Sequence, residues 1–468
     1  MTSSDRSETR IEPAGPAEPT GPSEPTGQSE PTELSNPAGR SGRRAFLAGA
    51  GAAALAGLGA ACSSSDEPSA QPAGAGDQSA DSGPADGLGD GNASAVAGPS
   101  QPVPFRSDRQ LAVLRAPAAA GLVASFDVAV DTREELAATM MTLSAEVERI
   151  MSGEPGPTAD EILPPPDSGI LGDGALGDNA SVTLGVGASL FDGRFGLAER
   201  APAELIPMPR FFNDRLVRPE LSDGDLALIV AADDHQAAVH ALHQAVRVTT
   251  GKLRLRWVQE GYNDFLAPAD AGIAPTRNLM GFRDGTSNLD TADSEVMNEH
   301  VWVQSQDDEP DWAAGGTYVA VRIIRMLIEF WSAAALVRQE QIFGRHRQSG
   351  APLGQTGEGD VPAFAADHSD ETVPLRSHIR LANPRTPGTA RILRRGFSYL
   401  NGADGAGALD EGLLFIAYQR ALTTGFLNVQ SRLEGEPLED YIKPVGGGLF
   451  FVPPGPGDDG WLGQSLLG

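Results

Sequence analysis

Cysteine is almost absent from this chain, which has a single one, Cys62, among 468 residues. One cysteine cannot form an intramolecular disulfide or a thiolate metal cluster, so any metal chemistry must depend on histidine, carboxylates or a bound cofactor. Basic residues are also scarce: 35 Lys and Arg stand against 63 Asp and Glu, which gives a net charge of -28. Such a chain repels phosphate backbones and anionic lipid surfaces, and we expect no nucleic-acid partner. Seven histidines remain as candidate metal ligands.

The N-terminal part lacks the apolar periodicity of a folded domain. Residues 1–40 repeat Glu-Pro-Thr and similar triplets, which bury too little apolar surface to offset the entropy of ordering, so we expect a disordered extension. Residues 41–62 begin with SGRRAFL and continue as an uncharged Ala/Gly/Leu stretch, which is typical of a twin-arginine export signal, although Gly42 stands where Ser or Thr is common. A short transmembrane helix is the alternative, but the stretch is too short and too rich in glycine to span a bilayer.

Cys62 stands at the end of this signal, in the segment LGAAC, and a tether rich in Ser, Asp, Gly and Pro follows over residues 63–102. The segment is similar to a lipoprotein processing site, in which the cysteine carries lipid and the tether holds the domain off the membrane. Leu58 lies one position further from Cys62 than that pattern requires, so cleavage without lipidation stays an equal alternative. Both alternatives predict an extracytoplasmic protein, either periplasmic, surface-bound or secreted.

From residue 103 onward, strand-period and helix-period segments alternate. The first set predicts strands at 125–130, 181–189, 225–232 and 253–260, a helix that begins after Thr132, and a helix at 235–248. The second set predicts strands at 318–331, 412–419 and 449–452 and helices at 333–343 and 422–433. This order predicts an α+β protein of two ferredoxin-like halves with antiparallel sheets, residues 103–272 and 273–468. His240 and His243 share one helix, but no third ligand is evident, so we expect both at the surface.

The loop between the predicted halves carries GFRDGTSN at residues 281–288. Asp-Gly by itself marks many turns. This loop nevertheless resembles the Gly-x-x-Asp-Gly signature of dye-decolourising haem peroxidases, and five more segments resemble the exported deferrochelatase/peroxidase branch of that family. They are residues 184–192, 341–345, 377–385, 393–396 and 412–415. The resemblance, which covers residues 105–454, implies a dimeric α+β barrel type of fold with one haem b per chain in the C-terminal half.

The resemblance assigns three residues to haem chemistry. It makes His378 the axial ligand of the iron, because an imidazole held by a partner stabilises ferric haem. It makes Asp284 the carboxylate that moves the peroxide proton, and Arg394 the cation that stabilises the developing negative charge. Without the family, these residues suit a strand-end histidine, a turn residue and a surface ion pair. Arg395 competes with Arg394, since the interval from His378 is slightly shorter than in relatives.

Further residues of the same segments are expected around the haem. Those implied to border the haem and its propionates, where glycine allows close approach and arginine pairs with carboxylate, are Gly285, Thr286, Ser287, Asn383, Pro384 and Arg385. Leu413 and Phe415 are expected in the apolar distal wall, although ordinary core positions on a strand explain them equally well. Gly396 stands where another branch of the family has a distal Asn, so we expect no distal amide.

Two functions follow from the resemblance. The first is an exported haem b peroxidase that reduces hydrogen peroxide, oxidises dye, phenolic or porphyrinogen donors and, as in the deferrochelatase branch, releases iron from haem. The second is a non-catalytic haem-handling or iron-delivery component of an iron-uptake system. The implied partners are an iron permease and an extracytoplasmic iron-uptake protein, and members of the family often form homo-oligomers. No residue of the sequence separates the two functions.

Overall fold

The first half of the folded region is an antiparallel sheet covered by two helices. The computed structural model describes residues 102–468 except 156–159, 161, 173–178, 265–275, 365–371 and 384–388. The strands are β1 (Ala120–Val128), β2 (Ser181–Gly187), β3 (Leu226–Ala232) and β4 (Leu253–Tyr262), and the helices are α1 (Arg133–Ser152) and α2 (His235–Val248). The spatial order β4-β1-β3-β2, with all neighbours antiparallel, confirms the predicted ferredoxin-like half. Among the described residues, no helix combines the length and the apolar character that a membrane crossing requires.

Local capping explains where the two helices begin. Thr132 accepts a hydrogen bond from the backbone N–H of Glu135, and the Glu135 carboxylate accepts one from the backbone N–H of Thr132, which confirms the cap predicted there. Gly153 ends α1 in the left-handed conformation. Asp234 caps α2 by accepting from two backbone N–H groups. The sequence around each helix therefore determines its start.

The second half repeats the arrangement with a longer insertion. Its main strands are β7 (Thr317–Met326), β9 (Phe397–Ala403), β10 (Leu409–Gln419) and β11 (Ile442–Val452), in the spatial order β11-β7-β10-β9. A short strand β8 (Leu393–Arg394) pairs with β10, and β5 (Thr276–Arg277) pairs with β6 (Arg283–Asp284). The helices of this half are α3 (Ser294–His300), α4 (Ile328–Ser332), α5 (Leu336–Phe343), α6 (His378–Leu381), α7 (Phe426–Leu433) and α8 (Gln464–Leu467).

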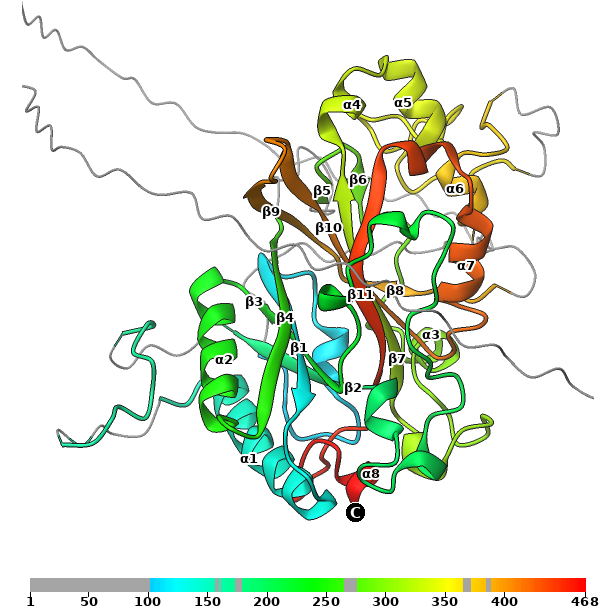
Figure 1. The fold of residues 1–468 in the computed structure, drawn as a ribbon. Coiled ribbons are helices and arrows are strands. Elements are labelled where there is room, and N and C mark those ends of the chain that lie inside the picture. Colours follow the sequence, from blue (N-terminus) through cyan, green and yellow to red (C-terminus); the bar gives the residue numbers. More distant parts are fainter. Residues whose placement is uncertain are drawn as a thin grey trace, which may run out of the picture. The chain divides into compact units, whose positions relative to one another are not determined.

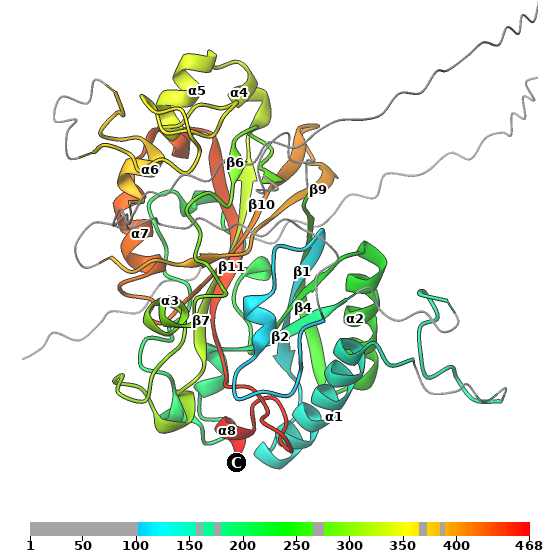
Figure 2. The same cartoon turned by 180° about the vertical axis from the view of Figure 1, so that it is seen from behind.

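The two sheets join along both edges into one closed ring of strands. On one edge β11 pairs with β2, Phe450 opposite Gly187, and on the other β4 pairs with β9, Tyr262 opposite Ser398. The pairing of β7 with β10 completes the ring. Figures 1 and 2 show α1 and α2 outside one sheet and α6 and α7 outside the other. The predicted α+β architecture with antiparallel sheets is confirmed, and the ring shows how its halves unite.

Several predicted boundaries in the second half were wrong. The strand predicted at 318–331 ends at Met326 and α4 follows, while the helix predicted at 422–433 begins only at Phe426. Strand β9 was not predicted. Strand β11 begins at Ile442, seven residues earlier than expected, because Pro444 and the glycines at 446–448 hide its strand periodicity. A register shift between Pro444 and Gly446 accommodates them. The expected boundary at residue 272 lies outside the described residues, as do residues 1–101 with the export signal and Cys62.

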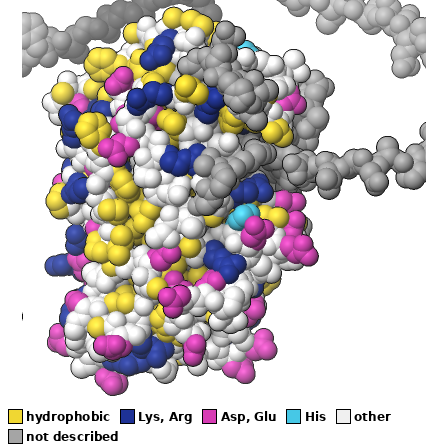
Figure 3. Space-filling model, turned by 90° about the vertical axis from the view of Figure 1, so that its right-hand side faces the viewer, with side chains coloured by type: hydrophobic (Ala, Val, Ile, Leu, Met, Phe, Trp, Pro, Cys, Tyr) yellow, Lys and Arg dark blue, Asp and Glu magenta, His cyan; other side chains and the backbone are white. Residues whose placement is uncertain are grey.

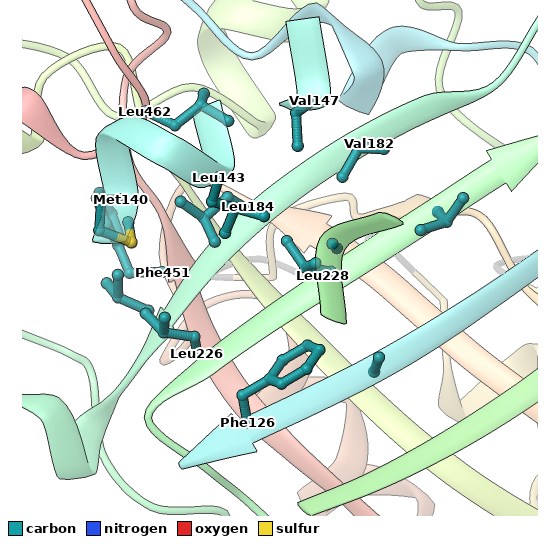
Figure 4. Packing of buried hydrophobic residues seen from close by; sticks show 14 of the residues in the cluster. Phe126, Met140, Leu143, Val147, Val182, Leu184, Leu226, Leu228, Phe451 and Leu462 are labelled. Carbon is teal, nitrogen blue, oxygen red and sulfur yellow. The ribbon is translucent and has the colours of Figure 1, made fainter. Parts of the chain in front are cut away.

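Two apolar layers hold this architecture together. In the outer layer, Met140, Leu143 and Val147 of α1 pack on Val182 and Leu184 of β2, and further side chains of β1 and β3 extend the contact (Figure 4). A second cluster lies inside the ring and combines side chains of both halves, among them Val123, Ile229, Trp257, Val321 and Ile416. Because neither half covers that inner face by itself, burial of apolar area favours closure of the ring.

The α2 histidines correct one expectation. His243 is exposed as expected, but His240 is only 6% exposed, and its Nε2 lies 2.8 Å from Oδ2 of Asp167. This contact fastens the Asp167 loop to α2, so His240 is a buried structural residue.

No group of three or more His, Cys, Asp or Glu residues within the described ranges could hold a bare metal ion. On the face that carries α6 and α7, acidic and basic side chains are interspersed with apolar ones (Figure 3).

Candidate functional site

A hairpin and the tight loop after it hold Asp284. Asp284 is the last residue of β6 and pairs with Thr276, whose hydroxyl donates to the Asp284 carbonyl at 3.1 Å. Gly285 and Ser287 then adopt positive φ angles of 94° and 59°. Glycine takes this conformation without strain, whereas Ser287 does so at some cost, which is typical of a backbone held for function. The loop turns the chain sharply just beyond the Asp284 carboxylate.

The same loop binds Arg394. Nη1 of Arg394 lies 3.5 Å from Oδ1 of Asp284, and about one third of each side chain is exposed. Nη2 of Arg394 donates to the Thr286 carbonyl at 2.7 Å. The Asn288 amide accepts from the Arg394 backbone N–H at 3.0 Å and donates to its carbonyl at 2.8 Å. These four contacts place a guanidinium beside the carboxylate while both keep surface free for a ligand.

Arg395 faces different partners. Its Nε donates to the Arg115 carbonyl at 2.8 Å, and its Nη1 donates to the Arg394 carbonyl at 3.0 Å. Burial lowers the pKa of Arg395 to about 10. Of the two arginines that competed for the distal role, the structure therefore brings Arg394 to Asp284.

His378 begins α6 and is held by a buried carboxylate. Its Nδ1 lies 2.9 and 3.1 Å from the two carboxylate oxygens of Glu436, a side chain that is 2% exposed, whereas the His378 side chain is 33% exposed. Burial lowers the pKa of His378, but the charge and the hydrogen bond of Glu436 outweigh it and raise the pKa overall. With Nδ1 donating to Glu436, the lone pair of Nε2 is directed away from that contact.

The histidine lies in the same region as the carboxylate and the arginine. The charge of Arg394 lowers the pKa of His378 and that of Asp284 raises it, so both lie within electrostatic range of the ring. A second layer supports the loop: Glu358 accepts from the Thr286 hydroxyl at 2.8 Å and pairs with Arg283. The region thus combines one available imidazole with an acid–base pair.

The other expected site residues are distributed around this centre. Gly285, Thr286 and Ser287 form the loop itself. Leu413 of β10 is half-buried and packs on the small cluster of Met280, Phe282 and Trp331 behind that loop. Phe415 instead packs against the outer apolar layer, and its ring centre lies 6.2 Å from the ring centre of Phe426. The Asn383 carbonyl accepts from Arg432 at 3.2 Å. Pro384 and Arg385 lie outside the described residues.

These residues suit an iron porphyrin better than a bare ion. A single imidazole is too few ligands for a free metal ion, but a porphyrin supplies four nitrogens and needs only an axial partner. The Nδ1–carboxylate contact of His378 is the arrangement that orients such a ligand and makes it more basic. The partly exposed side chains of Arg394, Asp284 and Leu413 offer the same ligand a hydrogen-bond donor, an acceptor and apolar surface, respectively.

Sequence reasoning missed Glu436, Asn288 and Glu358. Asn288 was available as a signal, because it stands in the quoted GFRDGTSN segment and loop asparagines commonly bind backbone groups. Glu436 lies 58 residues from His378 in the chain, between a glycine and a proline, and no local pattern connects the two. Glu358 likewise lies 72 residues from Thr286 along the chain, although the two side chains are in contact.

Comparisons with known proteins identify the family of the chain. Residues 110–263 match the family described as Dyp-type peroxidase, N-terminal, and residues 275–456 match Dyp-type peroxidase, C-terminal. A deferrochelatase of Escherichia coli O6:K15:H31 is 44% identical over 368 residues, 78% of this chain and 87% of that protein. The deferrochelatase of Escherichia coli K12 is 43% identical over the same lengths.

Solved structures show the same likeness. The DyP-type peroxidase from Cellulomonas bogoriensis has a TM-score of 0.71 and 33% identity, and the match covers 79% of this chain and 99% of that one. Ferric DtpA from Streptomyces lividans has a TM-score of 0.70 and 34% identity, covering 79% and 98%. Fold and site together define an enzyme of the haem-dependent peroxidase class. More particularly, the chain belongs to the Dyp-type peroxidase family, which confirms the resemblance found in the sequence.

Proposed function

We propose that this enzyme reduces hydrogen peroxide at a haem b, one per chain, held by His378, with Asp284 and Arg394 as the catalytic pair. The observation that carries the proposal is the Asp284–Arg394 contact of 3.5 Å within electrostatic range of His378 and its partner Glu436. An acid–base group and a fixed cation near an available axial ligand are what peroxide cleavage requires. Bound haem would supply the redox-active iron.

The chain's own residues handle the proton and the charge. The Asp284 carboxylate accepts a proton from the oxygen of peroxide nearest it and returns it to the other oxygen, which leaves as water. The Arg394 guanidinium, fixed by Asn288 and Thr286, donates to that leaving oxygen while negative charge develops on it. Reduction of one peroxide to two waters consumes two protons and two electrons, and the reducing substrate supplies the electrons.

Haem contacts are assigned to the surrounding loop and strand. The residues that we assign by resemblance to the border of the haem and its propionates are Gly285, Thr286, Ser287, Asn383, Pro384 and Arg385. Leu413 and Phe415 contribute apolar surface. The half-buried position of Leu413 behind the Asp284 loop supports its place at the ligand, while the packing of Phe415 on Phe426 suits a core position as well.

Replacing Asp284 with Asn tests the proposal directly. The amide cannot take up the proton, so the second-order rate of reaction with peroxide falls by about 100- to 10,000-fold, while haem content stays unchanged. Stopped-flow absorbance measures the rate. Asp290→Asn is the matched control, because Asp290 is an exposed carboxylate in the same segment and should leave the rate unaltered. A normal rate in Asp284→Asn would remove Asp284 from the proton path.

Dye, phenolic or porphyrinogen donors are the proposed reducing substrates, and iron release from haem is a second proposed activity. The latter is supported by the name deferrochelatase carried by relatives that are 44% identical over most of the chain. Anaerobic incubation with haem followed by product analysis separates the possibilities. Free protoporphyrin would support iron release, and its absence beside strong dye oxidation would leave a plain peroxidase. Haem uptake without either product would favour a haem-handling component.

Export and partners complete the proposal. The twin-arginine pattern at residues 41–62 supports an extracytoplasmic location, and Cys62 is the candidate lipid anchor. An iron permease and an extracytoplasmic iron-uptake protein are the proposed partners, together with a second copy of the chain as a homo-oligomer. Mass spectrometry of the mature N-terminus distinguishes a lipidated Cys62 from simple cleavage.

A further inference from the structure

A pocket lies between the two halves of the ring, apart from the site of Asp284 and His378. It encloses about 420 Å³ between atoms, part of it open to solvent. Residues of β2 and β3 line it from the first half, and residues of β9 and β10 line it from the second. Its polar members are Arg115, Ser181, Thr183, Asn263, Arg395 and Tyr418. Neither Asp284, Arg394 nor His378 is among its lining residues.

The charge of this pocket is of one sign. Two arginines line it, but no aspartate or glutamate does. Arg115 is compensated by Asp233, at 2.6 Å. Arg395 has no such compensation: its hydrogen bonds go to the carbonyl oxygens of Arg115 and Arg394, and no carboxylate among the described residues forms an ion pair with it. A backbone carbonyl accepts a hydrogen bond but does not neutralise the charge.

The neighbouring groups do not supply the missing negative charge. Burial raises the pKa of Tyr418, so its hydroxyl stays neutral and can act as a donor. Burial lowers the pKa of Arg395 to about 10, and the side chain therefore remains charged at neutral pH. Asn263 donates its amide to the carbonyls of Ala118 and Gly396. The pocket thus presents a cation and neutral polar groups to whatever enters it.

The geometry points to a binding site for a small monovalent inorganic anion, such as a halide or nitrate, against the Arg395 guanidinium. Part of the 420 Å³ is open to solvent, and the space that can hold the centre of a water-sized sphere is only about 30 Å³, so a small ion fits and a large organic ligand does not. A water molecule would satisfy hydrogen bonds there, but only an anion would also offset the half-buried positive charge of Arg395. Arg395 donates to the carbonyl of Arg394, so the anion site adjoins the segment that carries the catalytic arginine.

Thermal unfolding of the haem-loaded protein tests this site. We expect bromide, compared with gluconate at equal ionic strength, to raise Tm by about 2–4 °C in a saturable manner, because an ion that binds only the folded state stabilises it. Arg395→Gln should abolish the rise. Arg338→Gln is the control, since Arg338 is exposed and remote from the pocket lining, and it should keep the rise. An unchanged haem absorbance spectrum during the titration shows that bromide is not bound at the iron.

A second measurement does not depend on the variant. In crystals grown with bromide, anomalous scattering should place one ion within contact distance of the Arg395 guanidinium. Absence of a peak there, or density for water alone, would overturn the inference. So would a wild-type Tm that ignores bromide, or an Arg395→Gln protein that responds as the wild type does. None of these outcomes depends on peroxidase activity, so failure here leaves the proposed function intact.

Discussion

Glu436→Gln removes the charge beside His378 but keeps a side chain of similar size whose oxygen still accepts from Nδ1. The lost quantity is the difference between a hydrogen bond to a charged group, about 1.5–3 kcal/mol, and a neutral one, about 0.5–1.5 kcal/mol. Because one third of the His378 side chain is exposed, screening favours the lower end, about 1 kcal/mol. The carboxylate stabilises the more positive ferric state, so its loss should raise the one-electron reduction potential by about 40 mV.

The haem-free protein provides an independent check through pH. Glu436 raises the pKa of His378 in the folded protein above its value of about 6.5 in the unfolded chain. The pair therefore contributes its full stabilisation of the folded state below about pH 6.5, and this contribution disappears as pH rises through the folded pKa. Urea unfolding should therefore show that the free energy of unfolding of the wild type exceeds that of Glu436→Gln most at about pH 5.5. This difference in free energy should shrink toward pH 8.5.

Spectroelectrochemistry measures the potential, and Glu434→Gln is the matched control. Glu434 is an exposed carboxylate two residues from Glu436 in the chain. Its replacement should change neither the reduction potential nor the pH dependence of the free energy of unfolding. An unaltered potential together with a pH-independent stability difference in Glu436→Gln would refute the reasoning, because it would mean that the carboxylate does not act on the imidazole.

Three other changes have defined outcomes. His378→Ala should cut haem retention on gel filtration, and full haem content would place the axial ligand elsewhere. Asn288→Ala removes both contacts to the Arg394 backbone. A resulting shift of the guanidinium by about 1 Å should lower kcat/KM for peroxide by about 100-fold, with haem content preserved. A wild-type kcat/KM would show that Asn288 does not position the guanidinium. Asp214→Asn leaves the buried Arg322 charge unpaired at a cost of about 3–5 kcal/mol, so Tm should fall by about 10 °C, and calorimetry that shows no shift would contradict this.

Local sequence patterns predicted most of the first half and its helix starts. Thr132 and Glu135 form the capping box because their spacing alone brings each side chain to the other's backbone. The strands of that half alternate or run apolar, contain no proline, and carry their glycines singly rather than in a run, so periodicity identified them. In β11, Pro444 and three successive glycines removed that signal, and β9 ends in four exposed residues, 400–403, that do not alternate between apolar and polar. Both strands exist because neighbours pair with them.

The sequence by itself determined the family, the GFRDGTSN loop and His378 as site candidates, and the β-α-β-β-α-β order of the first half. Only the tertiary structure decided which of two adjacent arginines meets Asp284, that Glu436 holds His378, and that two sheets close into one ring. The physical reason is range. Capping and periodicity act over a few residues, whereas these contacts join segments that meet only when apolar area is buried between the two halves.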